Sequence, residues 1–385
     1  MNPISPDSPS GSIRPLPILR AMIDALDHDL LRLLGRRYSL VNEIAEYKRE
    51  HGLPIRDVQR ECDIIKDRRA RATPLGLAPE LIESMFRLML WASRDRQAAL
   101  KAQVPLNIEP RNIAVIGGKG LMGRCMADLF GDLGHPVMIA DLDTRLTPEE
   151  AAAVADVVIV SVPIRNSVEV IRKVGPLVRK EALLMDVTSI KADPMKAMLE
   201  SSSASVVGTH PLFGPSVHSL QDQKVVICPG RGDEWLDWVR RMFQARGLVV
   251  RETSPEAHDQ AMSIVQVLVH FSTEVIGNTL AHLGVSIEDT LAFTSPIYLL
   301  ELLMTARHFA QSAELYGDIE MSNPGTPQVT EIFAKTAQQM HNLVTDKDHA
   351  GFVQMFTEVR KYFGSFTDYA LEQSGFLIDR LVERD

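Results

Sequence analysis

The sequence predicts a multidomain protein with an all-α N-terminal domain, then a doubly wound α/β domain, then a second all-α domain. In residues 15–100, apolar residues recur at spacings of three and four, which is typical of amphipathic helices. Over residues 111–254, short apolar runs alternate with helical segments, as in a parallel sheet covered by helices. From residue 255 to residue 385 the strand signal stops and helical segments follow.

The composition is that of a soluble globular protein, with 45% hydrophobic and 24% charged residues. The net charge of −9 argues against nucleic-acid binding, and the three cysteines lack metal-ligand spacing, as expected in a reducing cytoplasm. We find neither a secretory signal nor an apolar run long enough to cross a bilayer, so no membrane contact is expected. Residues 1–14 are rich in Pro, Ser and Gly and are expected to form a disordered tail, and residues 101–110 to form an extended linker.

The N-terminal domain is expected to begin with one long amphipathic helix over residues 16–50, which Gly52 and Pro54 end. A second helix should begin near Asp57 and a third should span about residues 79–100. Three helices of this size cannot bury so long an apolar stripe alone, because a small domain has too little interior. We therefore expect a homodimer.

The long helix carries three cations, Arg20, Arg37 and Lys48. Arg37 and Lys48 are eleven residues apart, so they project from nearly one face of the helix. Arg20 lies about 25 Å from Arg37 along the axis, so both can contact one small ligand only if Arg20 comes from another chain. A solvated helix face is the commoner explanation of such charges.

The polar pattern of residues 16–100 resembles that of the all-helical chorismate mutase family. Asp57, Arg60 and Glu61 share one face of the second expected helix, and Ser93 and Gln97 share one face of the third. The residues that match the family are Leu19-Arg20, Ile23-Asp24, Leu31, Arg37, Lys48, Pro54-Ile55-Arg56-Asp57, Arg60-Glu61, Ser93 and Gln97.

This resemblance implies a binding site for a dianionic substrate. Its expected cations are Arg37, Lys48, Arg60 and the partner's Arg20, which would hold the dianion and its ether oxygen. Its other expected contacts are Glu61, Asp57, Ser93 and Gln97, with Gln97 near the ether oxygen. Because the rearrangement of chorismate to prephenate is pericyclic, it requires a held conformer and stabilised charge on the ether oxygen rather than a nucleophile.

The α/β domain opens with an apolar strand that leads into Gly118-Lys-Gly120-Leu-Met-Gly123 and a helix. In this context Gly118 is expected to make a tight turn, Gly120 to let a pyrophosphate approach, and Gly123 to let the helix pack on the strand. The next strand ends on Asp141, which suits a ribose 2′-hydroxyl and favours NAD over NADP. A glycine turn without a ligand is the alternative.

Further strands are expected after the first two, at residues 156–163, 182–188, 206–209, 224–228 and 248–251. The helices expected after them cover residues 255–283, 296–316, 327–345 and 348–383, and their apolar faces fit a dimerising domain.

The most distinctive later motif is Gly208-Thr-His210-Pro-Leu-Phe-Gly-Pro215. His210 is expected to follow a strand on the cofactor side of the sheet, and Ser189, at the end of the preceding strand, to lie within hydrogen-bonding reach of it. A structural loop histidine is the alternative. His258 and His270 differ by about 120° on a helix, so we expect no metal site there, and each histidine is expected to have a structural role or to support a residue of the site.

Residues 111–385 resemble the prephenate dehydrogenases. The matching segments are residues 117–123, 160–163, 188–191, 210–215, 258–260 and 295–301, with Arg307 after them. The order of the domains resembles that of the bifunctional chorismate mutase/prephenate dehydrogenases of bacterial tyrosine biosynthesis. The resemblance implies that the substrates are chorismate and prephenate, that NAD is the cofactor, and that tyrosine is a candidate feedback ligand.

The same resemblance implies specific roles. His210 would accept the proton of the ring hydroxyl of prephenate, Ser189 would orient that hydroxyl, and Arg307 would bind a substrate carboxylate. Hydride would pass to NAD⁺ while the ring carboxylate leaves as CO₂. The expected cofactor-binding residues are Gly118, Gly120, Leu121, Met122, Gly123, Asp141, Ser161, Val162 and Pro163.

The sequence departs from this family at two places. Leu299 stands where the bifunctional relatives often have arginine, and residues 323–327 also differ from them. Two other interpretations remain open at this stage. One is a prephenate or arogenate dehydrogenase whose mutase-like helices serve only dimerisation, and the other is a nucleotide-sensing protein without turnover.

Overall fold

The structure is a computed structural model that describes residues 14–100, 109–217 and 219–382. The chain divides into two compact units, one centred on the N-terminal helices and the other on the remaining domains. Apart from Arg14, the expected tail lies outside the described residues. The expected linker also lies outside them, apart from residues 109 and 110.

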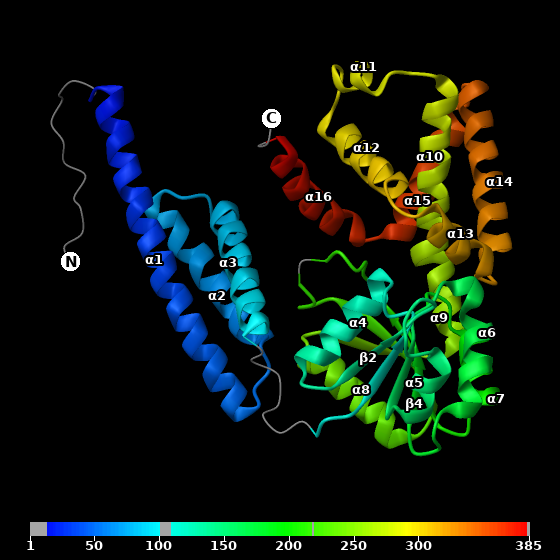
Figure 1. The fold of residues 1–385 in the computed structure, drawn as a ribbon. Helices are drawn as coiled ribbons and strands as arrows, with labels where there is room; N and C mark the ends of the chain where they lie inside the picture. The colour runs from blue at the N-terminus through cyan, green and yellow to red at the C-terminus, as the bar shows by residue number, and fades with distance from the viewer. Residues whose placement is uncertain (1–13, 101–108, 218, 383–385) are drawn as a thin grey trace. The chain divides into compact units, whose positions relative to one another are not determined.

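The N-terminal unit contains the three helices that the sequence predicts (Figure 1). Their bounds are α1 (Leu16–His51), α2 (Val58–Ala72) and α3 (Pro79–Ala99), with a short 3₁₀ turn η1 (Thr73–Leu75) after α2. Gly52 ends α1 in the left-handed conformation, with φ of 62°. Asp57 caps α2, because its side chain accepts a 2.9 Å hydrogen bond from the backbone N of Arg60.

The N-terminal half of α1 carries an apolar stripe that the described residues leave largely uncovered. Leu26 is 63% exposed, Leu30 is 54% exposed and Leu33 is 58% exposed. The buried residues of α1, Val41 and Ala45, lie only in its second half. This distribution agrees with the expectation of a homodimer.

The second unit is built on one seven-stranded sheet with strand order β2-β1-β3-β4-β5-β6-β7. The strands are β1 (Ile113–Ile116), β2 (Val137–Ala140), β3 (Val157–Val160), β4 (Leu183–Asp186), β5 (Ser205–Pro211), β6 (Lys224–Arg231) and β7 (Val249–Glu252). Strands β1 to β5 are parallel, β6 is antiparallel to β5, and β7 is parallel to β6. The predicted doubly wound sheet is therefore confirmed, with two reversed strands at one edge.

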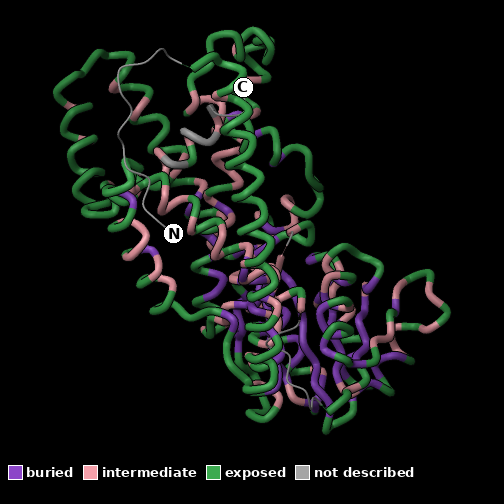
Figure 2. Tube along the Cα trace, turned by 90° about the vertical axis from the view of Figure 1, so that its left-hand side faces the viewer, coloured by how far each residue is buried: buried purple, intermediate pink, exposed green. Residues whose placement is uncertain are grey.

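Helices cover the sheet, and its central strands form the core. The helices are α4 (Leu121–Asp132), α5 (Pro148–Val154), α6 (Ile164–Val174), α7 (Ala192–Ser201) and α8 (Asp233–Ala245), with a 3₁₀ turn η2 (Gly175–Leu177) after α6. All residues of β1, β3 and β4 are buried, as expected for parallel strands covered on both faces. Figure 2 shows this buried core, in purple, concentrated in the strands.

The chain ends in a helical region that confirms the predicted second all-α domain. Its helices are α9 (Pro255–Met262), α10 (Val269–Leu283), α11 (Ile287–Leu291), α12 (Pro296–Phe309), α13 (Ala313–Ser322), α14 (Thr326–Thr345), α15 (His349–Phe363) and α16 (Phe366–Val382). A π-helical turn, η3 (Ser263–Leu268), joins α9 to α10, so residues 255–283 form the continuous helix that was predicted.

Two predicted helices of this region are wrong in extent. Residues 296–316 were expected to form one helix, but α12 ends at Phe309 and Ser312 caps the new helix α13. The predicted helix over 348–383 is likewise divided, because Gly364 ends α15 with a positive φ of 55°. Helix α11 was not predicted.

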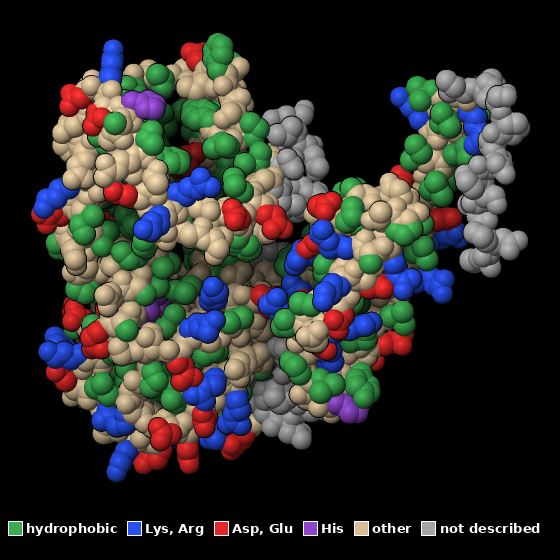
Figure 3. All heavy atoms as spheres, turned by 180° about the vertical axis from the view of Figure 1, so that it is seen from behind, with side chains coloured by type: hydrophobic (Ala, Val, Ile, Leu, Met, Phe, Trp, Pro, Cys, Tyr) green, Lys and Arg blue, Asp and Glu red, His purple; other side chains and the backbone are tan. Residues whose placement is uncertain are grey.

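By length and composition, one described helix, residues 255–283, could cross a membrane, with a mean hydropathy of 1.2. This differs from the expectation that the chain has no such run, although core helices of soluble proteins pass the same test. In the single chain, only 6% of the most apolar window of this helix is buried. Figure 3 shows hydrophobic side chains on the visible surface, intermixed with charged side chains of both signs.

Candidate functional site

The turn between β1 and α4 has the geometry of a phosphate-binding loop. Gly117 adopts a φ of +78°, and a Cβ there would collide with the carbonyl oxygen of Ser161. Gly117 supplies the positive φ of this tight turn, and Gly118 lies within the turn, which a hydrogen bond from the backbone N of Gly120 to the carbonyl oxygen of Gly117 closes at 3.1 Å. A Cβ at Gly118 would be 2.8 Å from the side chain of Ile139. A Cβ at Gly123 would strike the carbonyl oxygen of Gly117, so this glycine lets α4 pack against the turn, as expected.

The loop lies at the point where the strand order reverses. Strand β1 pairs with β2 on one side and with β3 on the other, which is where open α/β sheets bind nucleotides. Gly120 caps α4, and Leu121, at its first position, is 73% exposed. Met122 is half-buried beside it, and residues 161–163 follow β3 at the same edge. These residues fit the pyrophosphate of a dinucleotide, because a helix N-terminus favours anions and the glycines leave room for them.

Asp141 lies close to this loop. Its Oδ2 accepts a 3.0 Å hydrogen bond from the backbone N of Lys119, and its Oδ1 accepts a 2.9 Å hydrogen bond from the backbone N of Leu142. The carboxylate is therefore held beside the glycine turn by backbone donors. This is the geometry expected of a residue that accepts a hydrogen bond from a ribose hydroxyl.

His210 lies within β5 rather than after it, and its side chain is buried. Its Nδ1 is 2.9 Å from Nε2 of His258, whose Nδ1 is in turn 2.8 Å from Oδ1 of Asp259. Among the described residues, the structure gives His210 no hydrogen bond with Ser189, which is only half-buried. Burial, His258 and Lys191 together lower the pKa of His210 well below its usual value, so the ring is neutral at neutral pH.

A fully buried ion pair braces the strand ends beside His210. Lys191 pairs with Asp186, and its Nζ also lies 2.8 Å from the carbonyl oxygen of Thr209 and 3.1 Å from Oγ1 of Thr188. Thr209 also donates to the carbonyl oxygen of Asp186, at 2.5 Å. These contacts join β4 to β5 directly below His210 and fix its backbone.

His258, Asp259 and Lys191 belong to the site, although the sequence assigned them no specific function. His258 was expected either to have a structural role or to support a residue of the site, and Lys191 was expected only as part of the motif of residues 188–191. The adjacent pair His258-Asp259 at the first turns of a helix was a usable signal. Nothing in the spacing of 48 residues between His210 and His258 indicated that the two rings meet.

A second polar cluster lies in the helical domain, where α10, α12 and α13 meet. Nε2 of His308 is 3.0 Å from Oε1 of Glu274, and the His308 ring stacks on Tyr316 with centroids 4.0 Å apart. The ring of His270 contacts Tyr316 edge-on, with centroids 4.6 Å apart. Arg307 is exposed on α12, and its charge acts on Tyr316, whose pKa is nevertheless raised by burial. Arg307 is therefore close to this cluster rather than bonded within the His210 site.

Glu320, on α13, makes the stability of this cluster depend on pH. Burial, with a smaller effect from Glu274, raises the pKa of Glu320 to about 7. The unfolded carboxyl ionises at lower pH, so stability is full at acidic pH and falls as the pH rises through 7. In Glu320→Gln this loss should disappear, so the variant should gain about 1 kcal/mol relative to wild type at pH 8, after allowing for solvent screening. Urea unfolding at pH 5 and pH 8 measures it. An equal pH dependence in both proteins would contradict the assignment.

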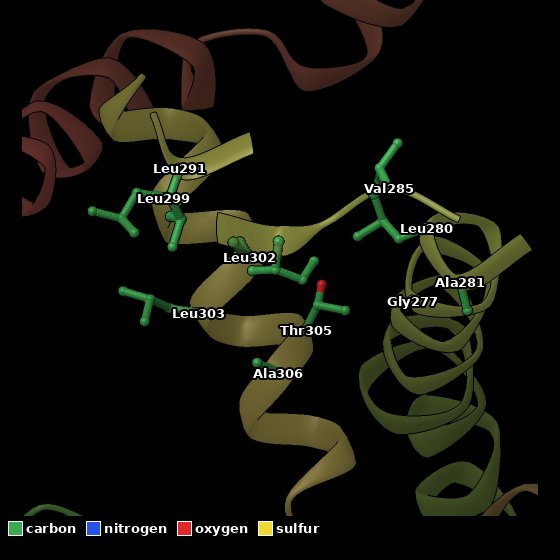
Figure 4. A pocket seen from close by; sticks show the side chains of 11 residues that line it. Gly277, Leu280, Ala281, Val285, Leu291, Leu299, Leu302, Leu303, Thr305 and Ala306 are labelled. Carbon is green, nitrogen blue, oxygen red and sulfur yellow. The ribbon is translucent and has the colours of Figure 1, made fainter. Parts of the chain in front are cut away.

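Leu299, the departure from the expected arginine, faces an apolar cavity of about 480 Å³ between α10 and α12 (Figure 4). Figure 4 shows leucine side chains around this space, with Thr305 beside them. Leu299 offers no donor to a carboxylate there.

The second departure, residues 323–327, has a structural role, because Asn323 Nδ2 donates to the carbonyl oxygen of Asp259 at 2.9 Å.

The N-terminal unit brings together several of its predicted site residues. Nη1 of Arg37 donates to Oγ of Ser93 at 2.6 Å, which links α1 to α3. Nζ of Lys48 donates to the carbonyl oxygen of Ile55 at 2.5 Å, and burial lowers the pKa of Lys48 although Asp57 and Glu61 oppose this. Gln97 is buried, its Nε2 donates to the carbonyl oxygen of Ser93 at 3.1 Å, and its Oε1 has no hydrogen-bond partner among the described residues. An unsatisfied buried acceptor is costly, which fits an oxygen that accepts a hydrogen bond from a ligand.

Three other predicted residues lie at the edge of this cluster or away from it. The side chain of Glu61 is bound by Arg94 at 2.6 Å, an interaction that the sequence did not indicate. The side chain of Arg60 is exposed. Arg20 is exposed on the N-terminal half of α1, so the chain itself does not bring it to Arg37.

Comparison with known proteins supplies the family. Three family models match the chain: chorismate mutase type II over residues 19–98, the nucleotide-binding domain of prephenate dehydrogenase over 138–252, and its dimerization domain over 254–358. The T-protein of Haemophilus influenzae is 36% identical over 364 residues, which cover 94% of this chain and 96% of that protein. The chain belongs to the T-protein family.

A second T-protein, from Enterobacter agglomerans, is 36% identical over 94% of this chain and 97% of its own length. The fold of the second unit also resembles a solved structure of prephenate dehydrogenase from A. aeolicus in complex with hydroxyphenyl propionate and NAD⁺. That likeness has a TM-score of 0.54 at 21% identity, over 66% of this chain and 98% of the other. The predicted family is confirmed, and with it a mutase domain joined to a NAD-dependent dehydrogenase.

Proposed function

We propose that the chain rearranges chorismate to prephenate at its N-terminal helices. It then oxidises and decarboxylates prephenate to 4-hydroxyphenylpyruvate in its second unit. The observation that carries this proposal is the buried, neutral His210 on the sheet that bears the glycine turn. The direct test supplies chorismate and NAD⁺ to the purified protein and follows NADH and 4-hydroxyphenylpyruvate. Prephenate that accumulates without NADH would contradict the second activity.

For the dehydrogenase, His210 accepts the proton of the ring hydroxyl through its Nε2, because Nδ1 is already engaged by His258. NAD⁺ held at the glycine turn would supply the hydride acceptor, and aromatisation of the ring would drive the loss of CO₂. Ser189 orients the hydroxyl from its place after β4, and Arg307 binds a substrate carboxylate from α12. The glycine turn, residues 161–163 and Asp141 hold the dinucleotide.

The choice between prephenate and arogenate depends on the helical cluster near Arg307. Arogenate carries an ammonium where prephenate carries a keto group, and Glu274 and Glu320 place two carboxyl groups in that cluster. We nevertheless assign prephenate, because the curated relatives that cover nearly the whole chain are T-proteins. Comparing kcat/KM for the two substrates tests this assignment.

For the mutase, Arg37 and Lys48 bind the two carboxylates of chorismate, with Arg60 and the partner's Arg20 completing the cationic set. Gln97 donates to the ether oxygen as its charge develops, and Ser93 holds Arg37 in place. Asp57 and Glu61 supply polar contacts from α2. This polar set, rather than apolar contacts alone, favours a catalytic domain over a dimerisation arm.

We further propose that the protein acts as a homodimer in the cytoplasm. The dimerization-domain match and the exposed leucines of α1 support a second copy of the chain as the partner. The apolar residues of α10 then contact that copy rather than lipid. Tyrosine is a candidate feedback ligand, and the net charge of −9 argues against a nucleic-acid partner.

Asp141 should determine the choice of cofactor. Asp141→Ala removes a hydroxyl acceptor and a charge that repels a 2′-phosphate, so NAD⁺ should bind about tenfold more weakly and discrimination against NADP⁺ should fall. Initial rates with both cofactors measure the effect. Asp143→Ala is the matched control, because its carboxylate contacts the Lys119 side chain at 2.8 Å rather than the backbone of the turn. Preference of the wild type for NADP⁺ would contradict this role.

A further inference from the structure

The imidazole of His210 is the first of three buried side chains that are hydrogen-bonded in series. Nδ1 of His210 meets Nε2 of His258 at 2.9 Å, and Nδ1 of His258 meets Oδ1 of Asp259 at 2.8 Å. The three residues are 3%, 1% and 2% exposed, so water does not compete for these hydrogen bonds. This series joins strand β5 to helix α9.

Asp259 is fixed as an ionised acceptor at the far end of this series. Burial alone would raise the pKa of Asp259, but hydrogen bonds from His258 and from the backbone N of Ala192 and Lys191 lower it overall. The two backbone donors lie at 2.8 Å and 2.9 Å, at the start of α7. A carboxylate at a helix N-terminus is stabilised in its charged form, and it can only accept hydrogen bonds.

The ionised Asp259 determines which ring nitrogen of His258, and then of His210, carries a hydrogen. Because Asp259 accepts, Nδ1 of His258 carries a hydrogen, and in that tautomer its Nε2 is a lone pair that accepts a hydrogen bond. Nδ1 of His210 must therefore donate to it. The remaining nitrogen of His210, Nε2, is left as a free base.

We infer that His258 and Asp259 are positioning residues that hold His210 in the Nδ1–H tautomer, with Nε2 as the nitrogen that takes the substrate proton. This inference rests on the proposed dehydrogenase function. When Nε2 takes the proton, the new imidazolium keeps its hydrogen bond to His258, and the Asp259 carboxylate stabilises its charge through that ring. The other buried carboxylate, Asp186, is paired with Lys191, so it does not supply this negative charge.

Among the titratable groups around His210, His258 and Asp259 are the ones that set its tautomer. From β4 and the loop after it come Asp186 and Lys191, which neutralise each other. From β6 comes Cys228, whose pKa burial raises to about 12, so it stays a neutral thiol. From α9 come His258 and Asp259.

Asp259→Asn tests the inference, because an amide can offer its NH₂ to His258 and permit the opposite tautomer. We expect kcat for prephenate oxidation to fall about 10²–10⁴-fold, with KM for prephenate and Kd for NAD⁺ changed less than about threefold. The acid limb of the kcat–pH profile should also shift. His258→Gln, which keeps a donor and an acceptor but no ring, should lose kcat in the same way. Mutase activity of each variant, measured on the same preparation, verifies folding.

The tautomer of His210 can also be measured directly, in the wild-type protein, from the NMR signals of its ring nitrogens. In ¹⁵N-histidine-labelled wild-type protein with NAD⁺, the His210 signals, assigned with His210→Asn, should report Nδ1 protonated and Nε2 unprotonated. They should lose this pattern in Asp259→Asn. Protonation at Nε2 in the wild type, or an Asp259→Asn variant that raises KM while kcat is retained, would overturn the inference. If the wild type does not oxidise prephenate, the proposed function fails, and the tautomer is still decided by the nitrogen signals.

Discussion

Replacing His210 with asparagine should lower dehydrogenase kcat by about 10²–10⁴-fold, because the substitution removes the general base. The side-chain amide of asparagine can still donate to Nε2 of His258, so the buried hydrogen bond that His210 makes with its neighbour is kept in kind. Binding of NAD⁺ should change little, because the glycine turn lies after a different strand. Steady-state kinetics with prephenate and titration of NAD⁺ binding measure both quantities.

His341→Asn is the matched control for this substitution, since His341 is exposed on α14. That variant should keep both activities. Chorismate mutase activity of His210→Asn, assayed in the same preparation, should equal that of the wild type. A near-normal kcat for prephenate in His210→Asn would rule out this histidine as the base.

A mixture of two inactive mutase variants should recover activity. Arg37→Ala removes a cation that is held by Ser93, and Arg20→Ala removes one that lies about 25 Å away along the same helix. If each site takes Arg20 from the partner, both homodimers should lose mutase activity by at least about 10²-fold. In a heterodimer of the two variants, one site contains both substitutions and the other contains neither. Complete exchange should therefore restore about a quarter of the wild-type activity.

Subunit exchange must be shown separately, for example with tags of different mass and native mass spectrometry. Arg32→Ala serves as the control, because Arg32 lies on the same helix and pairs only with Asp29 on the exposed surface. Mixing Arg32→Ala with Arg37→Ala should give no more activity than dilution of the former predicts. If exchange occurs and the Arg20/Arg37 mixture stays inactive, Arg20 does not act across the interface.

Those parts of the fold that depend on local pattern were predictable from the sequence. The strand, glycines and helix at residues 113–132 form a unit whose order identifies it, and the helix of residues 16–50 has an unbroken apolar period. The break between α12 and α13 was missed because the apolar period continues across Ser312, and only its side-chain cap reveals a new start. The positive φ of Gly117 was not predicted, because two adjacent glycines satisfy the same turn pattern.

Contacts between distant segments were not predictable. Ser189 and His210 were expected to meet because they follow neighbouring strands, and the strands are indeed paired. The imidazole turns instead to His258, because the helical domain packs an Asp–His pair against the end of β5. Periodicity within a helix carries no information about which strand that helix meets.

The π-turn η3 alters the direction in which two histidines point. On a regular α-helix, the twelve residues from His258 to His270 separate their directions by about 120°. A π-turn closes with an i→i+5 hydrogen bond and holds about one extra residue, which sets the rotation back by about 100°. The two rings therefore leave nearly the same flank of one helix, about 18 Å apart along its axis.

One imidazole on this flank thus reaches His210, and the other reaches Tyr316. If the same twelve residues formed a regular α-helix without η3, everything after it would be turned by more than a quarter of a circle. His270 would then no longer point toward α13, while His258 would keep its place. Deleting one residue from η3 should instead restore a regular helix and leave the direction of His270 nearly unchanged, because the π-turn absorbs one residue.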